Sequence, residues 1–391
     1  MTKEQGGTVK WQRLEDIDSY EDSTSFCDQH VHKKKKLGEG EQGTVKKTSL
    51  GQLRDDFGEI VYQKVKRAIP FSSNQTLLAI KYLPFSTNDF EDPRPGIRAQ
   101  YLAGNLTMGK DRSCTGIVPI YAAWICKRKR YTEEIAVMPI VGESIEKFAR
   151  GQWYATSEEK CTLSDLISNF LRLYTALIQI HSIGITHNDI QEGNVVVERV
   201  SMHGSQLVYR YRQLSSVVMI PPSRFHFSLT DFGICKTWTG LHPQRIEAEQ
   251  ADLESLSSVF YLWFASGATI LPEDDEKRLV QLLADFGLPA RRIYKRDIRK
   301  MGISFDMAPL PNQRLAEILL QRRTHPLLAD FIDGKVSSDT KWVIVDLAAQ
   351  SDKARVRSRS KSPERRLVSS KPTGDHYNRQ YHQPAPCCVV L

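Results

Sequence analysis

The chain has 391 residues, of which 40% are hydrophobic and 9% aromatic, enough for one large two-lobed domain or two ordinary ones. The formal charge of +8 is concentrated in residues 351–391, where nine Lys and Arg face three Asp and Glu, which leaves about +2 for residues 1–350. This nearly neutral body excludes a strongly basic core, and we expect no nucleic-acid partner.

The cysteines are scattered, odd in number and without paired metal-ligand spacing, which predicts reduced thiols in the cytoplasm. They are Cys27, Cys114, Cys126, Cys161, Cys235, Cys387 and Cys388. Residues 1–16 lack an apolar signal core, so we expect no secretion. The longest uncharged apolar stretch, residues 256–271, is shorter than the roughly 20 residues that a bilayer requires and predicts a buried helix.

The first part of the chain is rich in predicted strands. Residues 1–30 form a polar extension, and the lysine run at 33–36 is expected to be a solvated face. In chain order the pattern then predicts two strands joined by a glycine turn over 37–47, an insertion at about 50–75, a strand over 77–83, a helix over 96–108, and strands over 117–126 and 134–140.

After Gly142 the pattern becomes mainly helical. A broad apolar stripe predicts a helix over 164–181, with Thr162 or Ser164 as its N-cap. The further expected elements are strands over 194–200, 206–211 and 225–230, an insertion at about 201–224, helices from 250 to about 322, and a last helix near 341–350. Residues 351–391 are rich in Ser, Arg and Pro and are expected to be disordered.

A glycine-rich segment opens the first pair of predicted strands. Gly38, Gly40 and Gly43 precede Val45 in the pattern G-x-G-x-x-G-x-V, and glycines allow a backbone to approach phosphates closely. A dinucleotide-binding fingerprint requires a helix after the glycines, whereas residues 44–47 have a strand pattern. The segment therefore favours a hairpin over phosphates, although glycine-rich turns are common by themselves.

Three further motifs follow in a fixed order. Ala79-Ile80-Lys81 lies in a predicted strand, where Lys81 is either an ordinary surface lysine or a phosphate ligand. His187-x-Asp189-x4-Asn194 forms a polar loop between an apolar helix and a strand, and places a carboxylate and an oxygen ligand five residues apart. Asp231-Phe232-Gly233 follows another apolar strand. Phosphoryl transfer requires such groups to position an acceptor hydroxyl and to hold Mg²⁺.

With these motifs in order, residues from about 35 to 345 resemble the eukaryotic protein-kinase-like superfamily, most closely a divergent Ser/Thr protein kinase. The resemblance implies an α+β bilobal fold, with a small antiparallel-sheet N-lobe over 31–141 and a larger helical C-lobe over 142–350. It also implies ATP and Mg²⁺ as cofactors and a protein hydroxyl as acceptor.

The resemblance assigns roles residue by residue. Asp189 would orient and deprotonate the acceptor, and Lys81 would hold phosphates. The Mg²⁺ ligands would be Asn194 and Asp231. His187 would brace the loop, and Asp252 would hydrogen-bond its backbone. The nucleotide would be covered or lined by Gly38, Gly40, Gly43, Val45, Ala79, Met138 (the gatekeeper position) and Ile140 in the hinge over 139–141.

The chain departs from the family pattern at four places. Gln100 stands where the family has a helix-borne Glu that pairs with the strand lysine; a Gln can hydrogen-bond Lys81 but supplies no charge. Asn188 replaces the usual Arg, Gln191 replaces a Lys, and the segment from 231 to 252 is short and has no A-P-E motif. Phosphorylation of that segment is therefore not expected to be a switch.

Two other classes remain open. The loop His187-Asn188-Asp189 with Gln191–Asn194 also resembles that of choline and ethanolamine kinases, and more loosely aminoglycoside phosphotransferases, which phosphorylate small hydroxyl compounds. A pseudokinase scaffold is the third reading, for which Gln100 is the main argument. The presence of Lys81, Asp189, Asn194 and Asp231 together favours an enzyme.

The last four residues, from Cys388 to Leu391, form a C-a-a-X box whose final Leu favours geranylgeranylation. Cys387 is a palmitoylation candidate, and the basic run over 355–366 would add attraction to anionic lipid. We therefore expect a cytoplasmic protein held peripherally on a membrane, with the nucleus less favoured. A chance C-a-a-X ending, and a solvated or nuclear-targeting basic run, are the alternatives. Phosphorylation of Ser358, Ser360 and Ser362 would reduce the basic charge.

Overall fold

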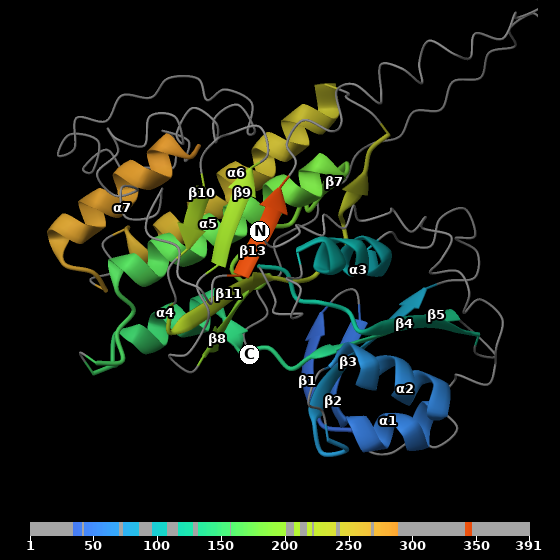
Figure 1. Ribbon diagram of the computed structural model, residues 1–391. Helices are drawn as coiled ribbons and strands as arrows, with labels where there is room; N and C mark the ends of the chain where they lie inside the picture. Colours follow the sequence, from blue (N-terminus) through green and yellow to red (C-terminus); the bar gives the residue numbers. More distant parts are fainter. Residues whose placement is uncertain are drawn as a thin grey trace, which may run out of the picture. The chain divides into compact units, whose positions relative to one another are not determined.

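Figure 1 shows the computed structural model of the chain. It describes residues 34–40, 43–69, 73–85, 96–107, 116–127, 132–156, 158–200, 207–211, 217–220, 223–239, 243–266, 270–287 and 341–345. The predicted polar extension, the basic segment after residue 350, and Cys387 and Cys388 lie outside the described residues. The described part is mixed α+β, with a small antiparallel sheet and several helices.

The first sheet has five antiparallel strands in the order β1-β2-β3-β5-β4. The strands are β1 (Lys36–Gly40), β2 (Gly43–Ser49), β3 (Leu77–Phe85), β4 (Ala122–Lys127) and β5 (Thr132–Pro139). The predicted glycine hairpin and the predicted strand over 77–83 are confirmed. The strand predicted over 117–126 begins only at Ala122, because Ile117 instead forms an isolated parallel bridge with Leu229.

The predicted insertion at about 50–75 contains two helices, α1 (Leu50–Phe57) and α2 (Glu59–Ala68). A capping box between Ser49 and Gln52 starts α1, because each side chain accepts a hydrogen bond from the other residue's backbone N–H. The apolar faces of both helices share one buried cluster with β3, β4 and β5, and Phe57 meets Trp124 edge to face at 4.9 Å. The helix pair therefore covers one face of the sheet, and the other face remains for the site.

The solvated face expected for the lysine run at 33–36 is wrong for Lys34. Its side chain is 4% exposed and its Nζ lies 2.5 Å from Asp56 Oδ2, at the buried end of α1, and 5.2 Å from the Phe57 ring centroid. The added helix pair supplies both the carboxylate and the aromatic ring. A buried lysine needs such a partner because an unpaired charge is costly away from water.

Helix α3 (Gly96–Thr107) agrees with its prediction to within one residue. Its residue Ile97 packs in a cluster with the inner face of the sheet, whereas Ala99 and Ala103 belong to the core of the helical part. Gly104 permits close approach, since an added Cβ would lie 3.0 Å from Pro119 Cα. The helix therefore links the inner face of the sheet to the second core.

The helical part contains α4 (Ile145–Gln152), α5 (Leu163–Ser182), α6 (Pro243–Phe264) and α7 (Glu273–Asp285). Short strands β6 (Glu143–Ser144), β8 (Val195–Arg199) and β11 (Phe225–Leu229) form one sheet, and β7 (Ile185–Thr186) pairs with β12 (Lys236–Thr237). The predicted helix α5 is confirmed, with Thr162 as N-cap. Helix α6 begins at Pro243 and not near residue 250, as proline is favoured in the first turn of a helix.

The last helix predicted near 341–350 is wrong, because residues Lys341–Val345 form strand β13. This strand runs parallel to β9 (Leu207–Tyr211), which also pairs with β10 (Val217–Ile220), so the predicted insertion at 201–224 supplies two strands of this sheet. Three consecutive β-branched residues, Val343, Ile344 and Val345, explain the result, since they favour strands over helices.

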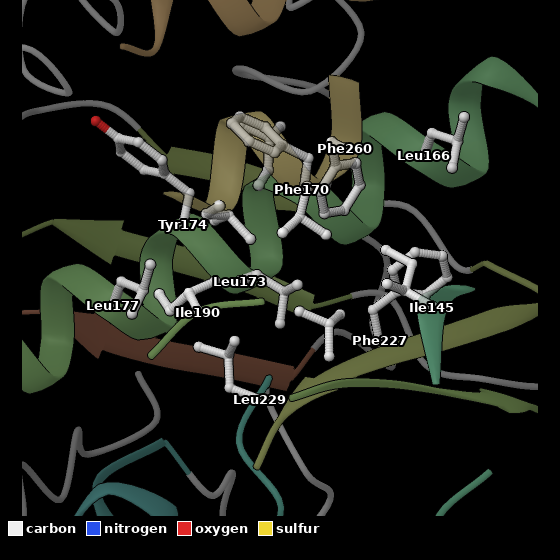
Figure 2. Close-up of a cluster of buried hydrophobic side chains, with 14 of the residues drawn as sticks. Ile145, Leu166, Phe170, Leu173, Tyr174, Leu177, Ile190, Phe227, Leu229 and Phe260 are labelled. Carbon is white, nitrogen blue, oxygen red and sulfur yellow. The ribbon is translucent and has the colours of Figure 1, made fainter. Parts of the chain in front are cut away.

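The core of the helical part is built around α5, of which nearly every residue is buried. Figure 2 shows α5 side chains surrounded by residues of β11, α6 and the loop that follows β7. Phe170 meets Phe260 edge to face at 5.2 Å, and Tyr174 meets Phe286 at 4.8 Å. This rigid packing fixes the ends of β7, β8 and β11, where the candidate site lies.

The cysteines that the structure describes differ in their state. Cys161 and Cys235 are free and buried, whereas Cys126 in β4 is disulfide-bonded. The expectation that all seven cysteines are reduced is therefore wrong for Cys126.

Within the part of the chain that the structure describes, no helix combines the length and the apolar character needed to cross a bilayer.

Candidate active site

The polar loop between β7 and β8 is held in place by hydrogen bonds from its backbone to the buried carboxylate of Asp252. Asp252 of α6 is 1% exposed; its Oδ2 accepts hydrogen bonds from the backbone N of His187 at 2.7 Å and from His181 Nε2 at 2.9 Å. Its Oδ1 accepts a hydrogen bond from the backbone N of Asn188 at 2.8 Å. Ile190 of the same loop enters the hydrophobic core shown in Figure 2. The loop is thus fixed by one buried acid and one apolar anchor.

His187 braces the loop and does not reach the solvent. Its Nε2 donates to Thr230 O at 3.1 Å, its Nδ1 accepts from the backbone N of Asp189 at 3.3 Å, and its ring lies 4.5 Å from that of Phe232. Burial is the main cause that lowers the pKa of His187, against the nearby carboxylate of Asp252, which acts to raise it. A neutral ring matches one donating and one accepting nitrogen.

Asp189 and Asn194 face each other across the loop. Asn194 Nδ2 donates to Asp189 Oδ2 at 2.8 Å and to Asp189 O at 2.9 Å, and Gln191 Nε2 donates to the same Oδ2 at 3.3 Å. Asp189 Oδ1 accepts no hydrogen bond from the described residues. One carboxylate oxygen is therefore held in place while the other is available to accept a proton.

Asp231 comes to this loop from a different strand. Thr230 N donates to Asn194 O at 3.0 Å, which joins the end of β11 to the start of β8 and places Asp231 beside the loop. Asp231 and Asn188 both have φ of 61°, a conformation that is uncommon among non-glycine residues but that Asp and Asn adopt more readily than most. Asn188 Nδ2 also donates to Ile234 O at 3.3 Å, so this residue connects the loop to the segment that follows Asp231.

Lys81 of β3 reaches Asp231 across 150 residues of sequence. Its Nζ lies 2.7 Å from Asp231 Oδ1, and the two side chains are 13% and 35% exposed. The segment that leads into β4 is hydrogen-bonded to the end of β11, two residues before Asp231. Leu229 N donates to Gly116 O at 2.8 Å, and Val118 N donates to Leu229 O at 2.9 Å. The amine of the sheet and the carboxylate of the helical part therefore meet directly.

An apolar surface adjoins these charged groups on the inner face of the sheet. Four of the residues predicted to line a nucleotide site belong to this one cluster: Val45, Ala79, Met138 and Ile140. Val196 of β8 completes it from the helical part. Val196 was not among the site residues predicted from the sequence, although its place directly after the polar loop, in a Val-Val-Val run, is a signal for it.

The three glycines lie on the β1–β2 hairpin but differ in the space that surrounds an added Cβ atom. Gly40 pairs with Gly43 next to the tip. Gly43 has φ of 154°, and an added Cβ would lie 2.1 Å from Tyr82 O, so the neighbouring strand alone demands glycine there. A Cβ at Gly38 would meet nothing within 4 Å. Gly38 therefore leaves open space, as close approach of another molecule would require.

Gln100 does not contact Lys81, the interaction that the sequence analysis considered for it. Gln100 is 3% exposed, and its Nε2 donates to Val118 O at 3.0 Å. Since Val118 is bonded to Leu229 at the end of β11, Gln100 attaches α3 to the segment that precedes Asp231. Its role is that of a neutral hydrogen-bond donor, which a glutamate could not fill.

We expect Gln100→Glu to destabilise the protein. A carboxylate would replace a donor opposite the Val118 carbonyl in a buried position, at a cost of about 3 kcal/mol in the free energy of unfolding. Urea denaturation at pH 8 measures it. Gln100→Leu is the matched control, with an expected loss of about 1–2 kcal/mol; equal stability of Gln100→Glu and the wild type would contradict the assigned contact.

Glu134 of β5 is a second buried acid near the site that the sequence analysis missed. It is 7% exposed, and burial raises its pKa to about 7, against the opposing effects of Arg98 and then Lys81. In the sequence, the only available signal was a Glu in a strand pattern whose alternate residues are apolar.

The titration of Glu134 predicts a pH dependence of stability. Its folded-state pKa of about 7 lies above the ordinary value of 4.5, so the folded chain binds a proton that the unfolded chain releases. The free energy of unfolding should therefore fall as pH rises from about 4.5 to about 7, by roughly 3 kcal/mol. Urea denaturation across this range should show the slope in the wild type and in Glu133→Gln, and its loss in Glu134→Gln; an unchanged slope in Glu134→Gln would refute the assignment.

The donor set fits a small, hard cation with phosphate. Asn194 Oδ1 and Asp231 Oδ2 accept no hydrogen bond from the described residues, while their partner atoms are held by Asp189 and Lys81. In the described part of the chain, no three His, Cys, Asp or Glu residues gather as a dedicated metal cage. Mg²⁺ commonly has only one or two protein carboxylates and completes its shell with water and substrate phosphates, so these residues suit it.

No protein-family model matches the chain, and a search of curated proteins also returned no match.

Proposed function

We propose that the chain is an ATP- and Mg²⁺-dependent phosphotransferase with a bilobal, protein-kinase-like fold, and specifically a Ser/Thr protein kinase. The observation that carries the proposal is the meeting of Lys81 and Asp231 at 2.7 Å beside a loop that presents Asp189 and Asn194. These four side chains come from three separate segments, and their types match the needs of phosphoryl transfer.

Each group then has a distinct task. Asp231 and Asn194 would hold Mg²⁺, which supplies neutralisation of the phosphate charge when bound. Lys81 would donate to phosphate oxygens, and the cluster containing Ala79, Met138 and Val196 would contact the adenine. Asp189, held through Oδ2, would receive the proton of the acceptor hydroxyl on Oδ1. His187 is buried and favours the neutral form, so it would position the loop and not transfer the proton.

A small-molecule hydroxyl is the second candidate acceptor, and one observation favours it. Helix α6 begins at Pro243, about twelve residues after Asp231, and β12 and Trp238 in the intervening segment are already bonded to Thr186 and Gly184. Little chain is left to form a surface for docking a peptide. A pseudokinase is the third candidate, against which stand the four functional side chains just described.

Transfer of γ-labelled phosphate from ATP tests the proposal. The full chain would be assayed with Mg²⁺ against generic protein acceptors and, separately, against choline, ethanolamine and sugar alcohols, alongside Asp231→Asn. Label on protein that is absent with Asp231→Asn supports the protein kinase, and label on a small alcohol moves the assignment to the second candidate. ATP binding without Asp231-dependent transfer to either set supports the pseudokinase.

A further inference from the structure

The contact between Lys81 and Asp231 raises the question of which acid positions Lys81 when Asp231 is engaged elsewhere. If Asp231 binds a cation, as the proposed function requires, its carboxylate is shared, and Lys81, which would then face the phosphates, has no carboxylate of its own to position its amine. Helix α3 does not supply one, because the nearest candidate, Gln100, is neutral and is bonded to Val118 O.

The strand register places Glu134 on the same face of the sheet as Lys81. Lys81 pairs with Ala136 and Leu83 pairs with Glu134, so Lys81 and Glu134 are diagonal neighbours on adjacent antiparallel strands. Side chains at alternate positions share a face, and diagonal positions lie about 7–8 Å apart at Cα, within reach of two long side chains. The face is the inner one, since Ala79, Ala136 and Met138 of the same rows belong to the nucleotide-side cluster.

Glu134 is a buried acid on which two cationic side chains act. It is 7% exposed and accepts no hydrogen bond from the described residues, and the charges that act on it are Arg98 of α3 and Lys81 of β3. A carboxylate on a residue this buried is costly unless a cation pairs with it. The neighbouring acid of β5, Glu133, lies on the opposite face and pairs in register with Cys126 and Pro84.

We propose that Glu134 is the second acidic partner of Lys81, which takes over from Asp231 when Asp231 is engaged with the nucleotide-bound cation. Glu134 is then a positioning residue: it holds the amine against the phosphates from the sheet itself, in place of a carboxylate carried by α3. Arg98 would keep the carboxylate at the junction of α3 and β5. The proposal rests on the proposed function for the role of Asp231, but the pairing of Lys81 with Glu134 can be measured without nucleotide.

A double-mutant cycle of unfolding tests the pairing. Lys81→Met, Glu134→Gln and their combination would be made in the full wild-type chain and in the Asp231→Asn chain, and unfolded with urea at pH 8. With Asp231 neutralised, Lys81 should turn to Glu134, so the two changes should be coupled by about tenfold in the unfolding equilibrium constant. In the wild type the coupling should be smaller. Additive effects in the Asp231→Asn chain would overturn the proposal, whatever happens with nucleotide.

A second cycle, on MgATP affinity by calorimetry, tests the role. Glu134→Gln should weaken binding about tenfold, Glu134→Asp should recover part of it, and Lys81→Met combined with Glu134→Gln should be no weaker than Lys81→Met alone. Glu133→Gln is the matched control and should bind as the wild type does. Unchanged affinity in Glu134→Gln would overturn the role. Absence of MgATP binding by the wild type would instead contradict the proposed function, while the unfolding cycle still decides the pairing.

Discussion

Asp252→Ala should lower the free energy of unfolding by about 3–5 kcal/mol and abolish phosphotransfer. The substitution removes the acceptor of three buried hydrogen bonds, from the backbone N–H groups of His187 and Asn188 and from the His181 ring. Donors left without a partner away from water each cost about 1–3 kcal/mol. Because the same bonds shape the loop that carries Asp189, stability and activity should fall together.

Urea denaturation and the transfer assay measure the two effects on the same preparation. Glu247→Ala, an exposed acid on the same helix, is the control and should leave both nearly unchanged. Asp252→Asn retains one oxygen acceptor and should lose less stability than Asp252→Ala. If Asp252→Ala folded as stably as the wild type and remained active, the loop could not depend on this carboxylate.

Asp189→Asn should reduce kcat by about 10²- to 10⁴-fold while MgATP affinity changes little. The amide cannot accept a proton on Oδ1, but it can still accept hydrogen bonds from Asn194 Nδ2 and Gln191 Nε2, so the loop should keep its shape. Steady-state kinetics together with calorimetry separate the chemical step from binding. Glu192→Gln, a half-buried acid on the same loop, is the control. A large loss of MgATP affinity in Asp189→Asn would indicate that Asp189 binds the cation.

The sequence was sufficient to predict several of the strands and helices that surround the site, because their periodicity is regular and α5 begins at a clear N-cap, Thr162. The glycine hairpin, β3, α3 and α5 lie where the patterns placed them. The spacing of His187, Asp189 and Asn194 also indicated that they share one loop. Periodicity could not reveal β13, because a segment of five residues is too short for its pattern to separate a strand from a helix. Its pairing with the edge of β9 makes it a strand.

Local sequence patterns could not reveal contacts between residues that are far apart in the sequence either. Lys34 has the sequence context of a solvated lysine, and only the folded helix pair brings Asp56 to it. The hydrogen bond from Gln100 to Val118 depends on how α3 crosses the segment after residue 116, which no local pattern encodes. Glu134 stands out only when the register of β3 and β5 shows which face it shares with Lys81. These three residues depend on tertiary contacts for their roles.

The most direct test of the central claim is the Mg²⁺ dependence of ATP binding to the full chain. Calorimetric titration would be run with and without Mg²⁺, on the wild type and on Asp231→Asn. We predict that ATP binds in the presence of Mg²⁺, that removal of Mg²⁺ weakens binding at least tenfold, and that Asp231→Asn removes most of this dependence. Absence of binding, or binding that neither Mg²⁺ nor Asp231 affects, would contradict the assignment of Lys81, Asn194 and Asp231 to a nucleotide site.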